Sequence, residues 1–307
     1  MKNQLSLRQL PSKQERHELF GSVKPGPKTK PVDKDKMPDL QNMKKDFLFD
    51  IDVVGVANVK HPIIVHSQLQ PQTQTTIATF RLSSSVKRDH KGTNMSRFTE
   101  QLHDYHKKGL HADFASLKQF AKELAERLEQ SDATIEISFP WFFERTATQS
   151  QLTGLNHANA KINIHYDQNH DFNISVGLEV LTTTLCPCSK EISEYSAHNQ
   201  RGKISMEVTL TQDFDDQEID WKAQLLEAAE SNASARIYPV LKRPDEKAVT
   251  EQAYENPRFV EDMVRLVAAD LYEMPFVQEF RVTCQNEESI HLHDAIASIH
   301  VDKLKNE

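Results

Sequence analysis

The sequence predicts an α+β fold in which an antiparallel sheet carries its helices on one face. Segments of alternating apolar and polar residues, which are typical of strands, occur in pairs. Segments with helical periodicity, also in pairs, lie between them. This order of two strands, two helices and two strands occurs twice in the 307 residues. The halves share the order of elements without a clear sequence repeat, so we expect two related units of one architecture.

The first unit begins near Pro38, after a segment rich in Lys, Pro, Gln and Ser. That composition buries little apolar surface, and we predict a mobile N-terminal arm over residues 1–37. Asp113 precedes the second helix as its expected N-cap. The unit spans residues 38–168, with strands at 46–57, 73–83, 133–139 and 158–166 and helices at 96–107 and 113–130.

The second unit spans residues 169–307 and repeats this order. An apolar stripe marks its second helix, because residues three and four apart share one helix face. The stripe consists of Phe259, Met263, Leu266, Val267 and Leu271. The unit has predicted strands at 171–184, 203–211, 278–284 and 290–300 and predicted helices at 219–231 and 257–272.

Each unit on its own would leave one sheet face and its edge strands uncovered. Open strand edges are normally covered or paired, and closing several sheets into a barrel removes them. We therefore expect a homo-oligomer in which the sheets of several chains form a barrel.

Composition narrows the class of protein. The net charge of −8 argues against a general nucleic-acid binder, since such proteins usually present a basic surface. Three cysteines make a disulfide framework improbable and favour a reducing, cytoplasmic setting. The first residues lack the apolar core of a signal peptide, and no run approaches the ~20 apolar residues of a membrane helix.

The stretch LCPCSKEISEYSAHNQRG gathers Cys186, Cys188 and His198. A thiolate and an imidazole this close can share one divalent metal ion, and further ligands must come from elsewhere. Two inert buried cysteines are the structural alternative, but their flanking residues are polar. A redox-active cysteine pair is the second alternative. The familiar spacing of such a pair has two residues between the cysteines, whereas here there is one.

Carboxylates offer the missing ligand. Glu230 ends a predicted helix, and Glu246 follows Pro244 and Asp245, a composition typical of a helix start. Most glutamates on helices are simply solvated. Near the C-terminus NEESIHLHDA adds Glu288, His291 and His293, whose histidines would share one face of a strand.

A basic segment, VKRDHKGTNMSRF, lies just before a predicted helix. Amide groups at a helix start together with Lys and Arg side chains make an anion site, although a solvated basic loop explains the segment equally well. It lacks the glycine and Lys-Ser/Thr spacing of a Walker loop. The candidate phosphate ligands are Lys87, Arg88, Lys91 and Arg97.

Taken together, these motifs resemble the prokaryotic type IB GTP cyclohydrolase family. The resemblance rests on DLQN, VGVANVKHPI, HKGTNMSRF, LCPCSKEISEYSAHNQRG, LLEAAESNAS, LKRPDEKAVTEQAYENPRFVEDMVR and NEESIHLHDA, which keep the family's order from Pro38 onward. Asn94 departs from the histidine expected in many members, which puts a role for that position in doubt.

The resemblance implies a tunnelling fold and a homo-oligomer, a tetramer, with active sites at subunit interfaces. It also implies a reaction: GTP and water give 7,8-dihydroneopterin triphosphate and formate, the entry to tetrahydrofolate synthesis. A divalent metal, Zn or Mn or alternatively Fe, would activate water for attack on C8 of guanine.

The same resemblance implies roles for individual residues. Cys186, His198 and Glu230 would hold the metal, and Cys188 and His291 would transfer protons. The guanine edge would be anchored by Glu246, with Glu288 as the competing anchor. The triphosphate would lie against Lys87, Arg88, Lys91 or Arg97, with Lys242 and Arg243 in reserve.

Two other functions compete. Another tunnelling-fold enzyme, such as a nitrile reductase or a pterin synthase, would act on a purine or pterin. A metal-buffering protein would use Cys186, Cys188 and His198 only for storage, and neither Glu246 nor Glu288 would matter to it.

Overall fold

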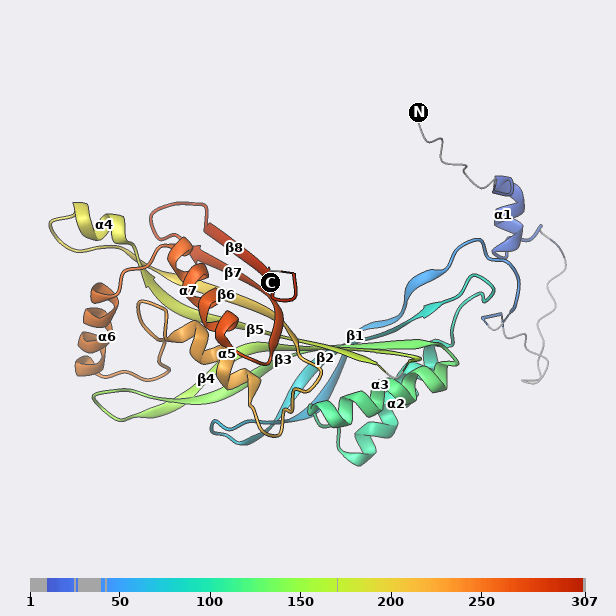
Figure 1. The fold of residues 1–307 in the computed structure, drawn as a ribbon, viewed down its shortest axis with the longest axis horizontal. Coiled ribbons are helices and arrows are strands. Elements are labelled where there is room, and N and C mark those ends of the chain that lie inside the picture. The colour runs from blue at the N-terminus through green and yellow to red at the C-terminus, as the bar shows by residue number, and fades with distance from the viewer. Residues whose placement is uncertain (1–9, 25, 27–39, 42, 170, 306–307) are drawn as a thin grey trace.

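The computed structural model describes residues 10–24, 26, 40–41, 43–169 and 171–305. Its centre is one antiparallel sheet in which eight strands follow in sequence order, from β1 at one edge to β8 at the other (Figure 1). The strands are β1 (Ile51–His66), β2 (Thr73–Val86), β3 (Asp132–Thr146), β4 (Thr153–Asp167), β5 (Phe172–Leu185), β6 (Asn199–Leu210), β7 (Val277–Glu287) and β8 (Ala295–Asp302).

The larger helices pack on one face of this sheet. α3 contacts β3 and β4, α5 contacts β5, and α7 contacts β7 and β8. The helices are α1 (Lys13–Leu19), α2 (Met95–Lys108), α3 (Phe114–Leu128), α4 (Pro187–Ile192), α5 (Trp221–Glu230), α6 (Arg243–Glu255) and α7 (Val260–Glu273). The predicted fold class, an antiparallel sheet with helices on one face, is confirmed.

Alternation along the strands builds the core. On β3, Ile135, Ile137 and Trp141 face the helix layer and are at most 2 % exposed. On the opposite face β2 and β3 carry the exposed ion pair between Arg81 and Glu136. Each fully buried apolar side chain contributes about 1.5–3 kcal/mol, so this one face stabilises the sheet and the helices together.

The sheet runs without a break through the boundary predicted between the two units. β4 ends at Asp167 and pairs with β5 from Phe172 onward. The second half of the chain contains one more long helix than the first, because α6 is inserted in the sequence between α5 and α7.

Several predicted boundaries are wrong. β1 begins at Ile51 rather than 46 and continues to His66, and β8 begins at Ala295 rather than 290. α4 was not predicted, and of α6 only the start, at Pro244 and Asp245, was indicated. In the α7 stripe Met263, Val267 and Leu271 are buried, but Leu266 and Phe259 remain partly exposed.

The N-terminal arm is described only in part. Within it α1 forms, with a capping box at Ser12 and no buried residue. Phe20, just after α1, packs its ring against Phe47 at a centroid distance of 6.1 Å. Residues 1–9, 25 and 27–37 of the predicted arm lie outside the described residues. No helix in the described part of the chain is both long enough and apolar enough to cross a membrane.

Candidate metal and substrate site

Cys186 and His198 lie opposite each other where β5 and β6 leave the sheet. The last paired residues of these strands are Leu185 and Asn199. One step further, the Cys186 amide donates to the His198 carbonyl at 3.1 Å. Both residues are half-buried. The ladder therefore places the thiol and the imidazole on adjoining backbone segments.

Pro187 turns the chain into a short helix directly after Cys186. Cys186 is the N-cap of α4, and its Sγ accepts from the Ser189 amide at 3.5 Å. Cys186 and Cys188 therefore do not lie on one extended backbone segment. Proline starts helices well because its fixed φ suits the first turn. Cys188 instead lies exposed in that turn.

Two serines fix the position of His198. The Ser189 hydroxyl accepts from the His198 amide at 3.2 Å. From the C-terminal loop, the Ser289 hydroxyl lies 3.2 Å from His198 Nδ1. These contacts hold the ring between α4 and the loop that precedes β8.

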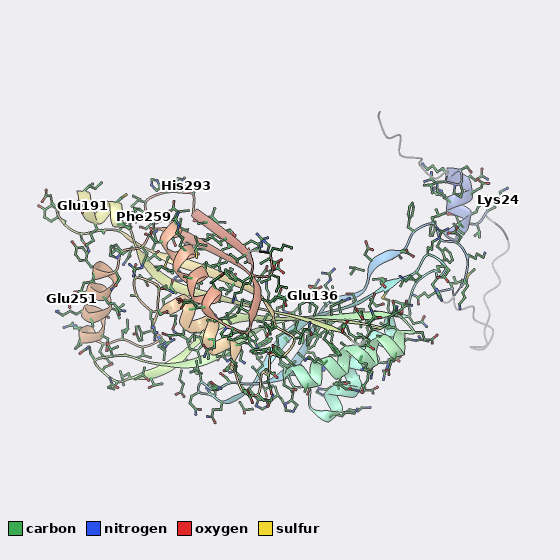
Figure 2. The ribbon with its side chains drawn as sticks, in the orientation of Figure 1. Lys24, Glu136, Glu191, Glu251, Phe259 and His293 are labelled. Carbon is green, nitrogen blue, oxygen red and sulfur yellow. The ribbon has the colours of Figure 1, made fainter. Side chains whose placement is uncertain are left out.

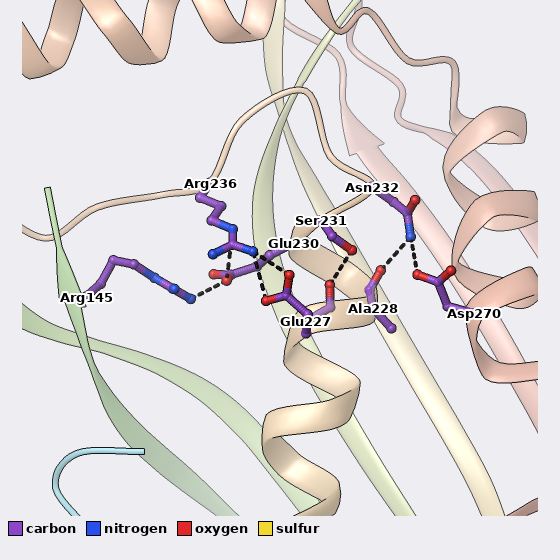
Figure 3. A network of polar contacts seen from close by, with 8 residues as sticks. All are labelled: Arg145, Glu227, Ala228, Glu230, Ser231, Asn232, Arg236 and Asp270. Atoms are coloured by element: carbon purple, nitrogen blue, oxygen red, sulfur yellow. Dashed lines mark hydrogen bonds and ion pairs between the residues drawn. The ribbon is translucent and has the colours of Figure 1, made fainter. Parts of the chain in front are cut away.

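Glu230 lies in a different environment, the arginine network of Figure 3. Its carboxylate, only 2 % exposed, forms an ion pair with Arg145 of β3. The Nε of Arg236 lies 3.7 Å from the same oxygen, Oε2. Burial raises the pKa of Glu230, and the charges of Arg145 and Arg236 act against that rise.

The described residues contain no group of three or more His, Cys, Asp or Glu side chains placed to hold a metal ion. The structure thus pairs Cys186 with His198 and leaves Glu230 bound to arginine. Sequence reasoning missed Arg145 as a neighbour of Glu230. No local pattern signals this contact, which joins residues 85 positions apart.

Glu246 lies on the helix that packs beside the Cys–His pair. Val249 and Ala253 of α6 pack with Leu185 and Ala197, which are the neighbours of Cys186 and His198 in the chain. Glu246 is exposed one turn before Val249, and residues three apart lie on the same helix face.

Asp245 fixes the start of this helix. Its buried carboxylate accepts from the amides of Gln149 at 2.8 Å, Ser150 at 2.9 Å and Lys242 at 2.9 Å. Hydrogen bonds from Ser150, and then from the Lys242 and Gln149 amides, hold the pKa of Asp245 well below its usual range. The turn between β3 and β4 is thereby tied to the first turn of α6.

The C-terminal candidates lie in the loop before β8. Gln200 Nε2 donates to Glu288 Oε1 at 3.1 Å, so Glu288 lies beside the strand that follows His198. His291 and His293 are exposed and precede β8, so the strand predicted for them is wrong. Their rings nevertheless stack at 4.8 Å between centroids. Figure 2 shows His293 and Glu191 of α4 at one end of the molecule and Lys24 at the other.

The basic candidates lie near the end that carries α1 (Figure 1). Arg88 is paired with Asp46, with Nη2 and Oδ2 2.5 Å apart. Arg97 donates to the Arg127 carbonyl at 2.8 Å. Lys87 and Lys91 form no ion pair with any described residue. Within one chain, the basic loop and the Cys–His pair therefore lie at opposite ends of the sheet.

A continuous antiparallel sheet with its helices on one face is the architecture of the tunnelling-fold class. In agreement, the structure resembles uricase from Arthrobacter globiformis with a TM-score of 0.50 at 10% sequence identity, covering 82% of this chain and 94% of that one. At this identity the likeness concerns the fold alone.

Residues 37–297 match the family described as "Type I GTP cyclohydrolase folE2". The chain is 65% identical over 296 residues to "GTP cyclohydrolase FolE2" of Oceanobacillus iheyensis, covering 96% of this chain and 98% of that protein. It is 54% identical to the protein of the same name from Bacillus subtilis strain 168, over 96% of this chain and 98% of the relative. The chain belongs to the type I GTP cyclohydrolase FolE2 family.

Proposed function

We infer that this chain is a GTP cyclohydrolase. It converts GTP and water into 7,8-dihydroneopterin triphosphate and formate, the first step of folate biosynthesis. Family membership over residues 37–297 supports the activity. The single structural observation that carries it is the pairing of Cys186 with His198 at one end of the sheet.

The donor types of this pair fit a divalent metal. Thiolate and imidazole together suit Zn(II), and a carboxylate with open positions also suits Mn(II) or Fe(II). When bound, such an ion lowers the pKa of water toward about 7 and so supplies hydroxide at neutral pH. Cys186 and His198 would hold it, with a carboxylate as the third ligand.

Two observations favour Glu246 over Glu230 as that carboxylate. Oε2 of Glu230 already binds Arg145, and exchanging a buried ion pair for a metal leaves the arginine without its partner. Glu246 is exposed on the face of α6 that packs beside Leu185 and Ala197. We therefore place Glu246 with the metal, where the sequence alone had suggested Glu230.

Guanine recognition then falls to Glu288. A carboxylate accepts two parallel N–H bonds from N1 and the 2-amino group, a charge-assisted pair. The hydrogen bond from Gln200 orients the Glu288 carboxylate from one side. Cys188 and His291, both exposed at this end of the molecule, are the proposed proton donors and acceptors during ring opening.

The triphosphate is proposed to bind a neighbouring subunit. Lys87 and Lys91 are the best candidates, since Arg88 and Arg97 are engaged within the chain. In one chain the segment after β2, which carries them, and α4, which follows Cys186, lie at opposite ends of the sheet (Figure 1). A homo-oligomer, proposed to be a cytoplasmic tetramer, brings the two ends of different chains together.

The test is GTP turnover by the purified protein, stripped of metal and reloaded separately with Mn(II) and Zn(II). Formate release and the fluorescence of the oxidised pterin are followed together. Metal-dependent formation of both products, absent in Cys186→Ala, is the expected result. Absence of both products with every metal would contradict the proposal.

A further inference from the structure

The helix that carries Glu246 is tied at its C-terminal end to the helix that follows Cys186. These helices, α6 and α4, lie at the same end of the molecule (Figure 1). From the last turn of α4, Lys190 Nζ donates to the Tyr254 carbonyl of α6 at 2.6 Å. The same ammonium lies 4.3 Å from the centroid of the Tyr254 ring, a cation–π contact. One side chain therefore joins the two helices.

The Tyr254 carbonyl can accept this bond because the chain leaves the helix just after it. α6 ends at Glu255, and the last four carbonyls of a helix lack a partner within it. In a longer helix the Arg258 amide would bond to the Tyr254 carbonyl, but it donates instead to the Leu185 carbonyl at 3.0 Å. Leu185 directly precedes Cys186. Two hydrogen bonds that run in opposite directions thus connect the end of α6 with residues on either side of Cys186.

Charge favours the contact of Lys190 with this helix end. Aligned peptide dipoles give the C-terminal end of a helix a partial negative charge, which a nearby cation stabilises. The last turn of α6, which the structure describes in full, contains no basic residue of its own. The ammonium of Lys190 supplies the cation from a neighbouring helix, and a hydrogen bond from a charged donor is stronger than one between neutral groups.

The apolar contact of α6 with the residues beside the Cys–His pair is small. It comprises Val249 and Ala253 of the helix. These side chains bury little apolar area, and the hydrophobic effect scales with that area. We therefore expect the bond from Lys190 to decide the position of the helix, and with it the position of Glu246.

We propose that Lys190 is a positioning residue for the metal site: its bond to α6 sets the distance between Glu246 and the Cys–His pair. The inference rests on the proposed function, in which Cys186, His198 and Glu246 hold the metal. Lys190 does not touch the metal itself. It holds the helix of one ligand against the segment that carries another. Groups that orient metal ligands in this way commonly contribute about 10–100-fold to metal affinity.

The test compares the Mn(II) affinity of the original chain with that of Lys190→Met and Lys190→Arg. Methionine keeps much of the side-chain length but lacks the ammonium, whereas arginine keeps a charged donor that can also stack on an aromatic ring. A titration followed by the EPR signal of free Mn(II) gives the dissociation constant. We expect this constant to rise about tenfold in Lys190→Met. Lys190→Arg should recover most of the loss.

Lys303 provides a matched control. Its Nζ donates to the Met274 carbonyl at the end of α7 at 2.8 Å and lies 5.5 Å from the centroid of the Tyr272 ring. This is the same kind of contact, but β8 separates Lys303 from the loop that carries His291. Lys303→Met should lower the thermal midpoint and keep the Mn(II) dissociation constant of the original chain.

A second readout separates positioning from direct contact with the substrate. At saturating Mn(II), Lys190→Met should have a lower kcat and an unchanged KM for GTP, because the variant alters the metal site and removes no bond to the nucleotide. A raised KM with unchanged Mn(II) affinity would overturn the inference and make Lys190 a substrate contact.

Two other results would also overturn the inference. One is an unchanged Mn(II) dissociation constant in Lys190→Met. The other is equal weakening of Mn(II) binding in Lys190→Met and Lys303→Met, which would show a general loss of stability. If the original chain bound Mn(II) but released no formate from GTP, the proposed function itself would fail. The comparison of Mn(II) affinities would still decide whether Lys190 positions the site.

Discussion

At the scale of single residues, each candidate side chain is placed by a particular backbone contact. Cys186 and His198 face each other because the β5–β6 ladder continues one step beyond Leu185 and Asn199. Glu230 is placed by arginines that arrive from β3 and from the turn after α5. The two candidate carboxylates therefore differ in their surroundings: Glu230 is bound to arginine, and Glu246 is exposed.

This difference predicts which carboxylate the metal needs. In Glu246→Gln the metal content should fall well below one ion per chain, because an amide is a poor replacement for a carboxylate ligand. Glu230→Gln should keep its metal but lose thermal stability, since Arg145 loses a buried partner. Metal analysis after dialysis and a thermal scan measure both. A metal-free Glu230→Gln beside a metal-loaded Glu246→Gln would reverse the assignment.

Asp245 predicts a pH dependence of stability. Its folded pKa lies below the ordinary 3.8, so its contribution is complete above about pH 4 and disappears as the pH falls toward the folded pKa. Asp245→Asn, which loses an acceptor for the Lys242 amide, should unfold at a lower temperature at pH 7. The gap between the two proteins should narrow below pH 4. A gap that widens on acidification would contradict this account.

At the scale of elements, local chemistry predicted the long helices and strands. Asp113 was expected to cap α3, and its side chain accepts from the Ser116 amide at 2.8 Å. The sequence failed where tertiary contacts decide. α4 has only six residues and no buried side chain, so it has no apolar periodicity to detect. α6 buries only Asp245 and Ala253, too few apolar residues for a stripe.

The cap at α3 can be tested against α2. Asp113→Ala should destabilise the chain by about 1 kcal/mol, the usual cost of losing a side-chain cap. The matched control is Asn94→Ala, because Asn94 caps α2 without a side-chain hydrogen bond and should cost much less. Denaturant unfolding measures both changes. Equal losses at the two positions would show that the Asp113 hydrogen bond contributes little.

At the scale of the whole molecule, the sheet leaves β1 and β8 as its edges and separates the basic loop from the Cys–His pair. The sequence predicted the antiparallel sheet and the one-sided helix layer because both follow from local periodicity. The sequence could not show which of the candidate residues are already engaged by other side chains. The contacts of Glu230, Asp245 and Gln200 join segments that are distant in the chain.

A site shared between subunits predicts complementation. Cys186→Ala and a Lys87→Ala/Lys91→Ala double variant should each have little GTP turnover. After subunit exchange, their mixture should recover part of it, because some interfaces then combine an intact metal end with an intact basic loop. A mixture of Cys186→Ala with His198→Ala should stay inactive, since both lesions lie at the same end. Recovery in neither mixture would contradict a shared site.

The oligomer itself is measurable by light scattering. The sheet edges at β1 and β8 predict an assembly at micromolar concentration, and the proposal specifies four chains. A stable monomer would contradict both the covered edges and the shared site.

As a GTP cyclohydrolase, this chain removes C8 of guanine as formate and closes the remaining atoms into a pterin. The most direct measurement uses GTP labelled with carbon-13 at C8 and follows both products by NMR and mass spectrometry. We expect labelled formate and unlabelled 7,8-dihydroneopterin triphosphate in equal amounts. A product that keeps the label, or labelled formate without a pterin, would contradict it.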